Sequence, residues 1–331
     1  MAPTLATPAV SVIIPAYHPG ETLLSCLRSL EDQTATEPFE VILVESSGDD
    51  TPARVREGFP WVRVLAFSER KYCGEARNLG IAQAQGDVIA FLDADCTAGR
   101  NWIEEILKAH RAGHSVVSGA VENGSRDSLT GWAYYFAEFS QWIPRGFEGP
   151  ARDIAGCCLA MDRATFEQHG PFLEGTYCSD TAFQWKMGRA GIRAHWTPSV
   201  RVAHHLTRRG LGAFLSHEVR HGRSFAAVRT REERASGARR AARVVGTPLL
   251  PLLLFCRIFA RVVGARRLFL PFLLASPLVL LGVAAWSWGE LLGYLTAAGS
   301  GAGKWQRTQG EAFPAEAEAL GDSAGPGRRG G

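Results

Sequence analysis

Short apolar runs alternate with longer amphipathic segments from Val10 to about His205. Several of the runs are apolar over nearly their whole length, which is typical of strands that helices cover on both faces. We therefore expect buried strands at Val10–Ile14, Glu40–Val44, Val62–Phe67 and Asp87–Leu92.

The segments between these runs have the spacing of helices. Leu23, Leu24, Leu27 and Leu30 fall on one helical face, and Glu75–Gln85 follows the same spacing with small residues. Further helices are expected around Trp102, Ile103, Ile106 and Leu107 and over Thr181–Gly191, with short strands over Ile192–His205. This alternation predicts an α/β fold with a mainly parallel, doubly wound sheet.

The composition becomes strongly apolar after Val244. Leu268–Gly289 has no charged residue over 22 positions, and about 20 apolar residues span a bilayer, so this run is predicted to be a transmembrane helix. Pro271 and Pro277 inside it are better tolerated in a packed membrane helix than in water. A buried helical hairpin in a soluble protein is the alternative for the whole apolar region.

The first apolar run, Gly246–Cys256, is shorter. Extended to Gly264 it could span, but Arg257 and Arg261 would then lie inside it, at a cost of about 2.5–3.5 kcal/mol each near the centre. A re-entrant or in-plane interfacial helix avoids this cost. The sequence leaves open whether one or two segments cross the membrane.

The formal net charge of +3 is small, but arginines crowd the segment before the apolar region. Next to a membrane anchor, this segment is predicted to be a juxtamembrane surface that contacts anionic lipid. It has few aromatic residues for stacking, so no nucleic-acid partner is expected. The arginines are Arg208, Arg209, Arg220, Arg223, Arg229, Arg231, Arg234, Arg239, Arg240 and Arg243, against Glu218, Glu232 and Glu233.

The cysteine spacing and the first residues indicate the cellular compartment of the protein. Seven cysteines without recurrent spacing, with Cys157 and Cys158 adjacent, are predicted to be free thiols in a reducing compartment. Met1–Ser11 has neither a basic region nor a long apolar core, so we expect no cleaved signal peptide. The predicted location is the inner or plasma membrane, with the α/β domain in the cytoplasm.

Polar residues follow three of the predicted strands. Asp93 and Asp95 come after the fourth strand and, on an extended chain, would face the same side. Pro15, Ala16 and Tyr17 follow the first strand, and Glu45 follows the second. Carboxyl ends of parallel strands form one crevice, so these groups are expected to meet there. A D-x-D sequence on its own is usually a turn.

Five segments in order resemble family-2 glycosyltransferases, which are inverting enzymes of the GT-A fold, with a Rossmann-like mixed sheet, that use a nucleotide-diphospho-sugar donor. The resemblance covers about Val10–His205. The segments are VSVIIPAYH, VILVESSGDDT, GEARNLGIAQAQGDVIAFLDADC, GCCLAMDRATF with GPFLEG, and SDTAFQWKMGRAG followed by VAHH.

The resemblance implies a divalent metal, Mn²⁺ or Mg²⁺, held by Asp95 and by His204, with His205 as the rival for the late histidine. Asp93 is implied as a ribose or metal-shell contact. Hard oxygen ligands and a divalent cation suit a diphosphate, whose leaving charge the cation neutralises.

The resemblance also implies a nucleotide site. Pro15, Ala16 and Tyr17 would line the base pocket, and Arg77 would contact the nucleotide. Glu45 stands where the family has the first Asp of a D-D-G-S turn; here the turn is ESSG. This difference leaves the base that is bound open.

Asp180 matches the family's catalytic base, with Ser179 in place of the usual glutamate. An inverting transfer needs one base to take the acceptor's proton, and a partly buried carboxylate can do so. A helix N-cap is the other role for Asp180. Gln184 and Trp185 lack the arginine of the processive-synthase motif, so polymerisation is not expected.

The sequence thus predicts a membrane-anchored, metal-dependent transferase with a lipid-linked or glycan acceptor. The alternatives are a nucleotidyltransferase on a related fold and a non-catalytic membrane scaffold. The expected organisation is a tail (1–9), a GT-A domain (10–207), a basic juxtamembrane segment (208–245), a membrane anchor of one or two helices (246–296) and a disordered tail (297–331).

Overall fold

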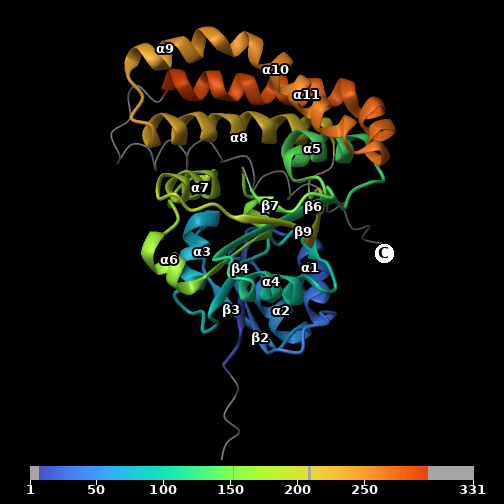
Figure 1. Ribbon diagram of the computed structural model, residues 1–331, viewed down its shortest axis with the longest axis vertical. Coiled ribbons are helices and arrows are strands. Elements are labelled where there is room, and N and C mark those ends of the chain that lie inside the picture. Colours follow the sequence, from blue (N-terminus) through green and yellow to red (C-terminus); the bar gives the residue numbers. More distant parts are fainter. Residues whose placement is uncertain (1–6, 152, 208–209, 297–331) are drawn as a thin grey trace, which may run out of the picture.

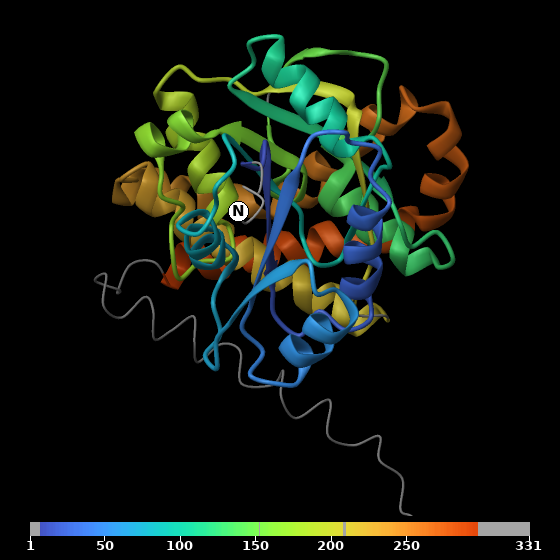
Figure 2. The same ribbon diagram turned by 90° about the horizontal axis from the view of Figure 1, so that it is seen from below.

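The protein is described here by a computed structural model covering residues 7–151, 153–207 and 210–296. The predicted disordered tail and two of the juxtamembrane arginines, Arg208 and Arg209, lie outside the described residues. A sheet with helices on both faces forms one body (Figures 1 and 2), and long helices are stacked over one end of it (Figure 1).

The predicted strands and helices are present with small changes at their ends, except that one strand, β9, stands where short strands were expected over Ile192–His205. The strands are β1 (Val10–Ala16), β2 (Phe39–Glu45), β3 (Val62–Ala66), β4 (Val88–Phe91), β5 (Cys96–Ala98), β6 (Val116–Asn123), β7 (Gly149–Pro150), β8 (Leu159–Asp162) and β9 (His195–His204). The helices of the sheet domain are α1 (Thr22–Glu31), α2 (Thr51–Gly58), α3 (Cys73–Ile81), α4 (Trp102–Arg111), α5 (Leu129–Phe139), α6 (Arg163–His169) and α7 (Ser179–Arg189).

The sheet is mixed, with strand order β3-β2-β1-β4-β8-β6-β9-β5 and β7 added on β9. Strands β3, β2, β1 and β4 are parallel, as predicted. Strand β8 is antiparallel to both β4 and β6, so the direction reverses in the middle of the sheet. Strand β9 then runs parallel to β6 and antiparallel to β5.

Helices on both faces explain the apolar composition of the central strands. All residues of β1 and β4 are buried. On one face, the buried α1 residues Leu23, Leu27 and Leu30 pack in the same apolar cluster as Val12 and Ile14 of β1. On the other face, Ile13 packs in a second cluster. The two clusters hold the carboxyl ends of β1, β2 and β4 at one edge.

The segment after the sheet domain forms a helical layer of α8 (Leu211–Glu232), α9 (Gly237–Gly246), α10 (Leu250–Val263) and α11 (Phe269–Thr296). Helix α8 lies between the sheet domain and α11 and runs along α11 (Figure 1). The two backbones are close, because a Cβ on Gly222 would stand 2.2 Å from the Trp286 carbonyl oxygen.

Two stretches, Gly237–Val263 and Arg266–Thr296, are long and apolar enough to cross a membrane. Apolar side chains such as Leu252, Leu273 and Trp288 are exposed on the layer. All seven cysteines are free, as predicted. Short 3-10 turns complete the chain at η1 (Ser140–Trp142), η2 (Gly156–Cys158), η3 (Thr247–Leu249) and η4 (Arg266–Leu268).

Candidate active site

The two carboxylates after β4 belong to a turn and not to an extended segment. The Cys96 amide donates to the Asp93 carbonyl oxygen at 2.9 Å, which closes the turn. The sequence expectation that Asp93 and Asp95 share one extended face is therefore wrong in its geometry. Both residues still line the same pocket, but each carboxylate has a different partner.

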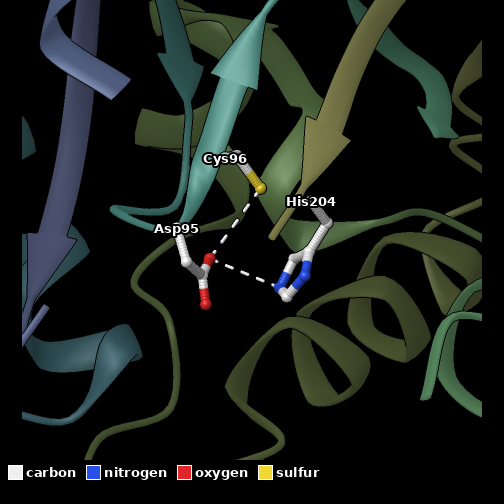
Figure 3. Close-up of side chains that lie close together, drawn as sticks. All are labelled: Asp95, Cys96 and His204. Carbon is white, nitrogen blue, oxygen red and sulfur yellow. Dashed lines mark hydrogen bonds and ion pairs between the residues drawn. The ribbon is translucent and has the colours of Figure 1, made fainter. Parts of the chain in front are cut away.

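Asp95 lies against His204. Its Oδ1 is 3.3 Å from His204 Nε2, because β5 pairs with β9 in a register that sets Cys96 opposite His204 (Figure 3). Burial raises the Asp95 pKa, and the charge of His204 opposes this shift. The Cys96 thiol is 3.9 Å from Asp95 Oδ1, and burial raises its pKa well above the ordinary value.

His205 points away from this pair. Its Nε2 is 3.1 Å from Thr97 Oγ1, and its ring packs on Gly124, where a Cβ would be 2.6 Å away. Consecutive residues at a strand end face opposite sides, so only one of the two histidines can face Asp95. That residue is His204, whose ring lies 4.5 Å from Phe139 and 5.6 Å from Tyr134.

Asp93 is paired with Arg77. The Arg77 Nη2 donates to Asp93 Oδ1 at 3.0 Å, and Arg77 is only 2% exposed. Its guanidinium lies over the rings of Phe91 and Phe172, at 5.7 Å and 5.6 Å. Arg77 therefore stands behind Asp93, and it is not one of the residues that line the pocket in the described part of the chain.

Asp180 lies in the first turn of α7, after the N-cap residue Cys178. Its Oδ1 accepts from the Thr181 amide at 2.8 Å. A Cβ on Gly156 would be 2.6 Å from Asp180 Oδ2 and 3.0 Å from Arg77 Nη2, so both side chains pack against this glycine. Asp180 thus joins the Arg77–Asp93 pair from the side of α7. It is not the N-cap itself.

The Glu45 carboxylate is hydrogen-bonded within the turn that follows β2. It is 1% exposed, and its Oε1 accepts from the Ser47 amide at 2.8 Å and from the Ser47 hydroxyl. The Ser47 hydroxyl accepts from the His18 amide at 2.7 Å, and Ser46 donates to the Ala16 carbonyl oxygen at 3.2 Å. Glu45 therefore fixes the loops after β1 and β2 to each other.

The pocket extends from the strand ends to helix α8. Pro15, Tyr17 and Asp95 line the strand end. The sequence did not indicate the other half, because those residues come from α5, from the loop before α7 and from α8. They are Tyr134, Tyr177, Ala213, Phe214, His217 and Arg220. Arg70 also lines the pocket, with its guanidinium 4.3 Å from the centre of the Tyr17 ring.

Residues 11–170 match the family described as Glycosyl transferase family 2. The chain is 33% identical over 125 residues to the glycosyltransferase AglE of Haloferax volcanii, covering 36% of this chain and 41% of that protein. It is 31% identical over 165 residues to the undecaprenyl-phosphate 4-deoxy-4-formamido-L-arabinose transferase of Pseudomonas syringae, covering 47% of this chain and 48% of that one. The chain thus spans less than half the length of these relatives.

A solved structure has the same fold. The mannosyltransferase PcManGT from Pyrobaculum calidifontis, in complex with GDP-Man and Mn²⁺, superposes with a TM-score of 0.54 at 20% sequence identity. The similarity covers 88% of this chain and 86% of that one, so it includes most of the helical layer. The predicted GT-A fold is confirmed by this similarity.

Proposed function

We propose that the chain, whose residues 11–170 match the glycosyltransferase family 2 model, transfers a sugar from a nucleotide-diphospho-sugar to a hydroxyl acceptor, with inversion. The observation that carries the proposal is the Asp95–His204 pair at the pocket into which Asp93 and Tyr17 also face. We place the diphosphate and the base of one donor in this pocket.

The residues present fit a divalent cation. A carboxylate oxygen and an imidazole nitrogen 3.3 Å apart match adjacent ligand positions, which are about 3 Å apart on a cation with bonds near 2.1 Å. The Cys96 thiol belongs to the same group of side chains, but a soft sulfur ligand suits zinc better than Mn²⁺ or Mg²⁺. Asp95 and His204 would hold Mn²⁺ or Mg²⁺, and the cation would neutralise the leaving diphosphate.

Asp180 is the proposed base that takes the proton from the acceptor hydroxyl. Arg77 is a positioning residue: it holds Asp93 by an ion pair and lies within 3.0 Å of the Cβ position at Gly156, against which Asp180 also packs. Pro15, Ala16 and Tyr17 would hold the nucleotide base, and Glu45 would act through the loop that it fixes.

Two relatives suggest the substrates. PcManGT is described with GDP-Man and Mn²⁺, and the Pseudomonas syringae enzyme is named for an undecaprenyl-phosphate sugar transfer. We propose that this chain also uses a nucleotide sugar and a lipid-linked acceptor. The pocket supports this assignment, because its α8 end lies beside the apolar helical layer.

The helical layer is proposed as the membrane attachment, with the sheet domain on the cytoplasmic side. We retain the organisation into a domain over 10–207, a basic segment over 208–245 and an anchor over 246–296. The arginines of α8 and α9 would meet anionic headgroups.

The test is donor turnover by membranes that contain the full-length chain. A panel of nucleotide sugars with Mn²⁺ or Mg²⁺ is incubated with native lipid extract, and release of nucleoside diphosphate is followed. Release from one donor, lost in Asp180→Asn, supports the proposal. Pyrophosphate release from a nucleoside triphosphate would favour a nucleotidyltransferase instead. Donor binding without turnover would favour the scaffold.

A further inference from the structure

A second group of metal-type side chains lies at the α8 end of the pocket. Glu138 comes from α5, and His217 and His221 come from one face of α8, one turn apart. Glu138 Oε1 is 3.0 Å from His221 Nδ1 and 3.4 Å from His217 Nε2. The three ligand atoms all lie within 4.8 Å of one another.

We propose that Glu138, His217 and His221 bind a second divalent cation of the zinc class. In a tetrahedral zinc site with bonds of about 2.05 Å, neighbouring ligand atoms are about 3.3 Å apart. The two distances from Glu138 lie close to this value. Two imidazoles and one carboxylate are a typical donor set for zinc and leave a fourth position open.

The surroundings of the cluster support a ligand. His217 Nε2 is buried and makes no hydrogen bond, although Glu138 Oε1 lies 3.4 Å away. The next residue, Glu218, is 1% exposed, and its Oε1 is also buried without a partner. Its carboxyl lies against Glu138. Buried polar atoms are normally satisfied, and carboxyl groups beside metal ligands commonly orient them.

This site is separate from the Asp95–His204 pair, although one aromatic residue contacts both. The Tyr134 ring stands between them, 5.6 Å from His204 and 5.2 Å from His217. His217 lines the pocket, so the open coordination position would face it. With one imidazole and a carboxylate, the first pair suits Mn²⁺ or Mg²⁺; with two imidazoles, the second group favours zinc.

A cation at this position would join α5 to α8 and so fasten the helical layer to the sheet domain. This predicts that zinc stabilises the folded chain, because a ligand that binds the folded state raises the melting temperature.

The experiment uses the full-length chain in detergent, purified without a histidine tag and stripped of metal. Co²⁺ serves as the spectroscopic probe and Zn²⁺ as the competitor. The expected result is one equivalent of Co²⁺ with the visible bands of a tetrahedral site, displaced by Zn²⁺. The bands should remain in Asp95→Asn. In Glu138→Gln and in His221→Ala, the affinity for Co²⁺ should fall by about 100-fold or more.

Glu138→Gln keeps the shape of the side chain, so it guards against loss of fold, and thermal melting without metal checks this for each variant. His169→Ala, on α6, is the matched control for the loss of a histidine. Equal affinity in wild type and Glu138→Gln would overturn the proposal, as would loss of the bands in Asp95→Asn alone. The readout does not involve sugar transfer, so it is independent of the proposed function.

Discussion

Asp95 is the residue on which the proposed transfer most depends, since its carboxylate faces His204 in the pocket. Asp95→Asn keeps the size of the side chain and removes its charge. We expect turnover to fall by about 100-fold or more, because the cation would be held weakly and the leaving diphosphate left uncompensated. The measurement is nucleoside diphosphate release across a Mn²⁺ titration. A normal rate at ordinary Mn²⁺ concentrations would contradict the assignment.

Gly156 tests whether Asp180 and Arg77 act together. The Cβ of Gly156→Ala would stand 2.6 Å from Asp180 Oδ2 and 3.0 Å from Arg77 Nη2, so both side chains must move. We expect turnover to fall by about 10-fold or more with little change in melting temperature, because side-chain ends shift more easily than backbone. Gly146→Ala is the control, since nothing lies within 4 Å of its Cβ position. Unchanged turnover would show that Asp180 is not the catalytic base.

His110 gives a pH-dependent prediction for stability. Burial lowers its pKa from 6.5 to about 4, and the charge of Asp162 opposes this shift. The unfolded chain therefore binds the proton more readily than the folded chain between pH 6.5 and 4. The contribution of neutral His110 to the free energy of unfolding is complete above pH 6.5 and falls as the pH drops toward 4.

His110→Gln should remove this dependence. Between pH 7 and pH 5, the free energy of unfolding should fall by about 2 kcal/mol more in the wild type than in the variant, as measured by urea unfolding. Equal pH slopes for the two proteins would show that His110 titrates normally in the fold.

Helices α8 and α11 approach through glycines. A Cβ on Gly222 would be 2.2 Å from the Trp286 carbonyl oxygen, and one on Gly289 would be 2.2 Å from the Val219 carbonyl oxygen. Backbone cannot yield as a side chain does, so Gly222→Ala should destabilise the chain by about 1–3 kcal/mol. Gly212→Ala, on the same helix with open space at its Cβ position, should be neutral or stabilising. Thermal melting of both variants in detergent decides this.

The arrangement of the whole molecule bears on how it meets the membrane. Helix α8 carries Arg220, Arg223, Arg229 and Arg231 and runs along α11. With 22 residues it is about 33 Å long, so a bilayer-crossing α11 would carry these arginines through the hydrocarbon. We therefore expect α11 to lie in the plane of the interface, although its composition predicts a span.

Labelling of the two ends of α11 tests this expectation. Arg266→Cys and Thr296→Cys, each in a Cys256→Ser background, place exposed thiols before and at the end of the helix. With an impermeant maleimide, both should react in inside-out vesicles and neither in right-side-out ones. Labelling of the two positions from opposite sides would establish a span.

The order of residues along the chain determined the strands and the helices, because burial on two faces acts over a few neighbouring residues. It left open whether Asp93 and Asp95 lie on an extended segment or in a turn, and the structure shows a turn. It also carried the resemblance to glycosyltransferase family 2, which the match over residues 11–170 confirms. The roles of Asp95, His204 and Asp180 remain predictions, although the structure brings Asp95 and His204 together.

Only the tertiary structure decided which distant groups meet. The reversal at β8 and the register of β5 on β9 set His204, and not His205, against Asp95. The Arg77–Asp93 pair depends on how α3 packs on β1 and β2, because Arg77 lies on α3 and Asp93 follows β4. Glu138 and His221 are 83 residues apart, and no local pattern relates them. Such contacts arise from packing of whole elements, so the sequence could place each residue on its helix or strand but could not name its partner.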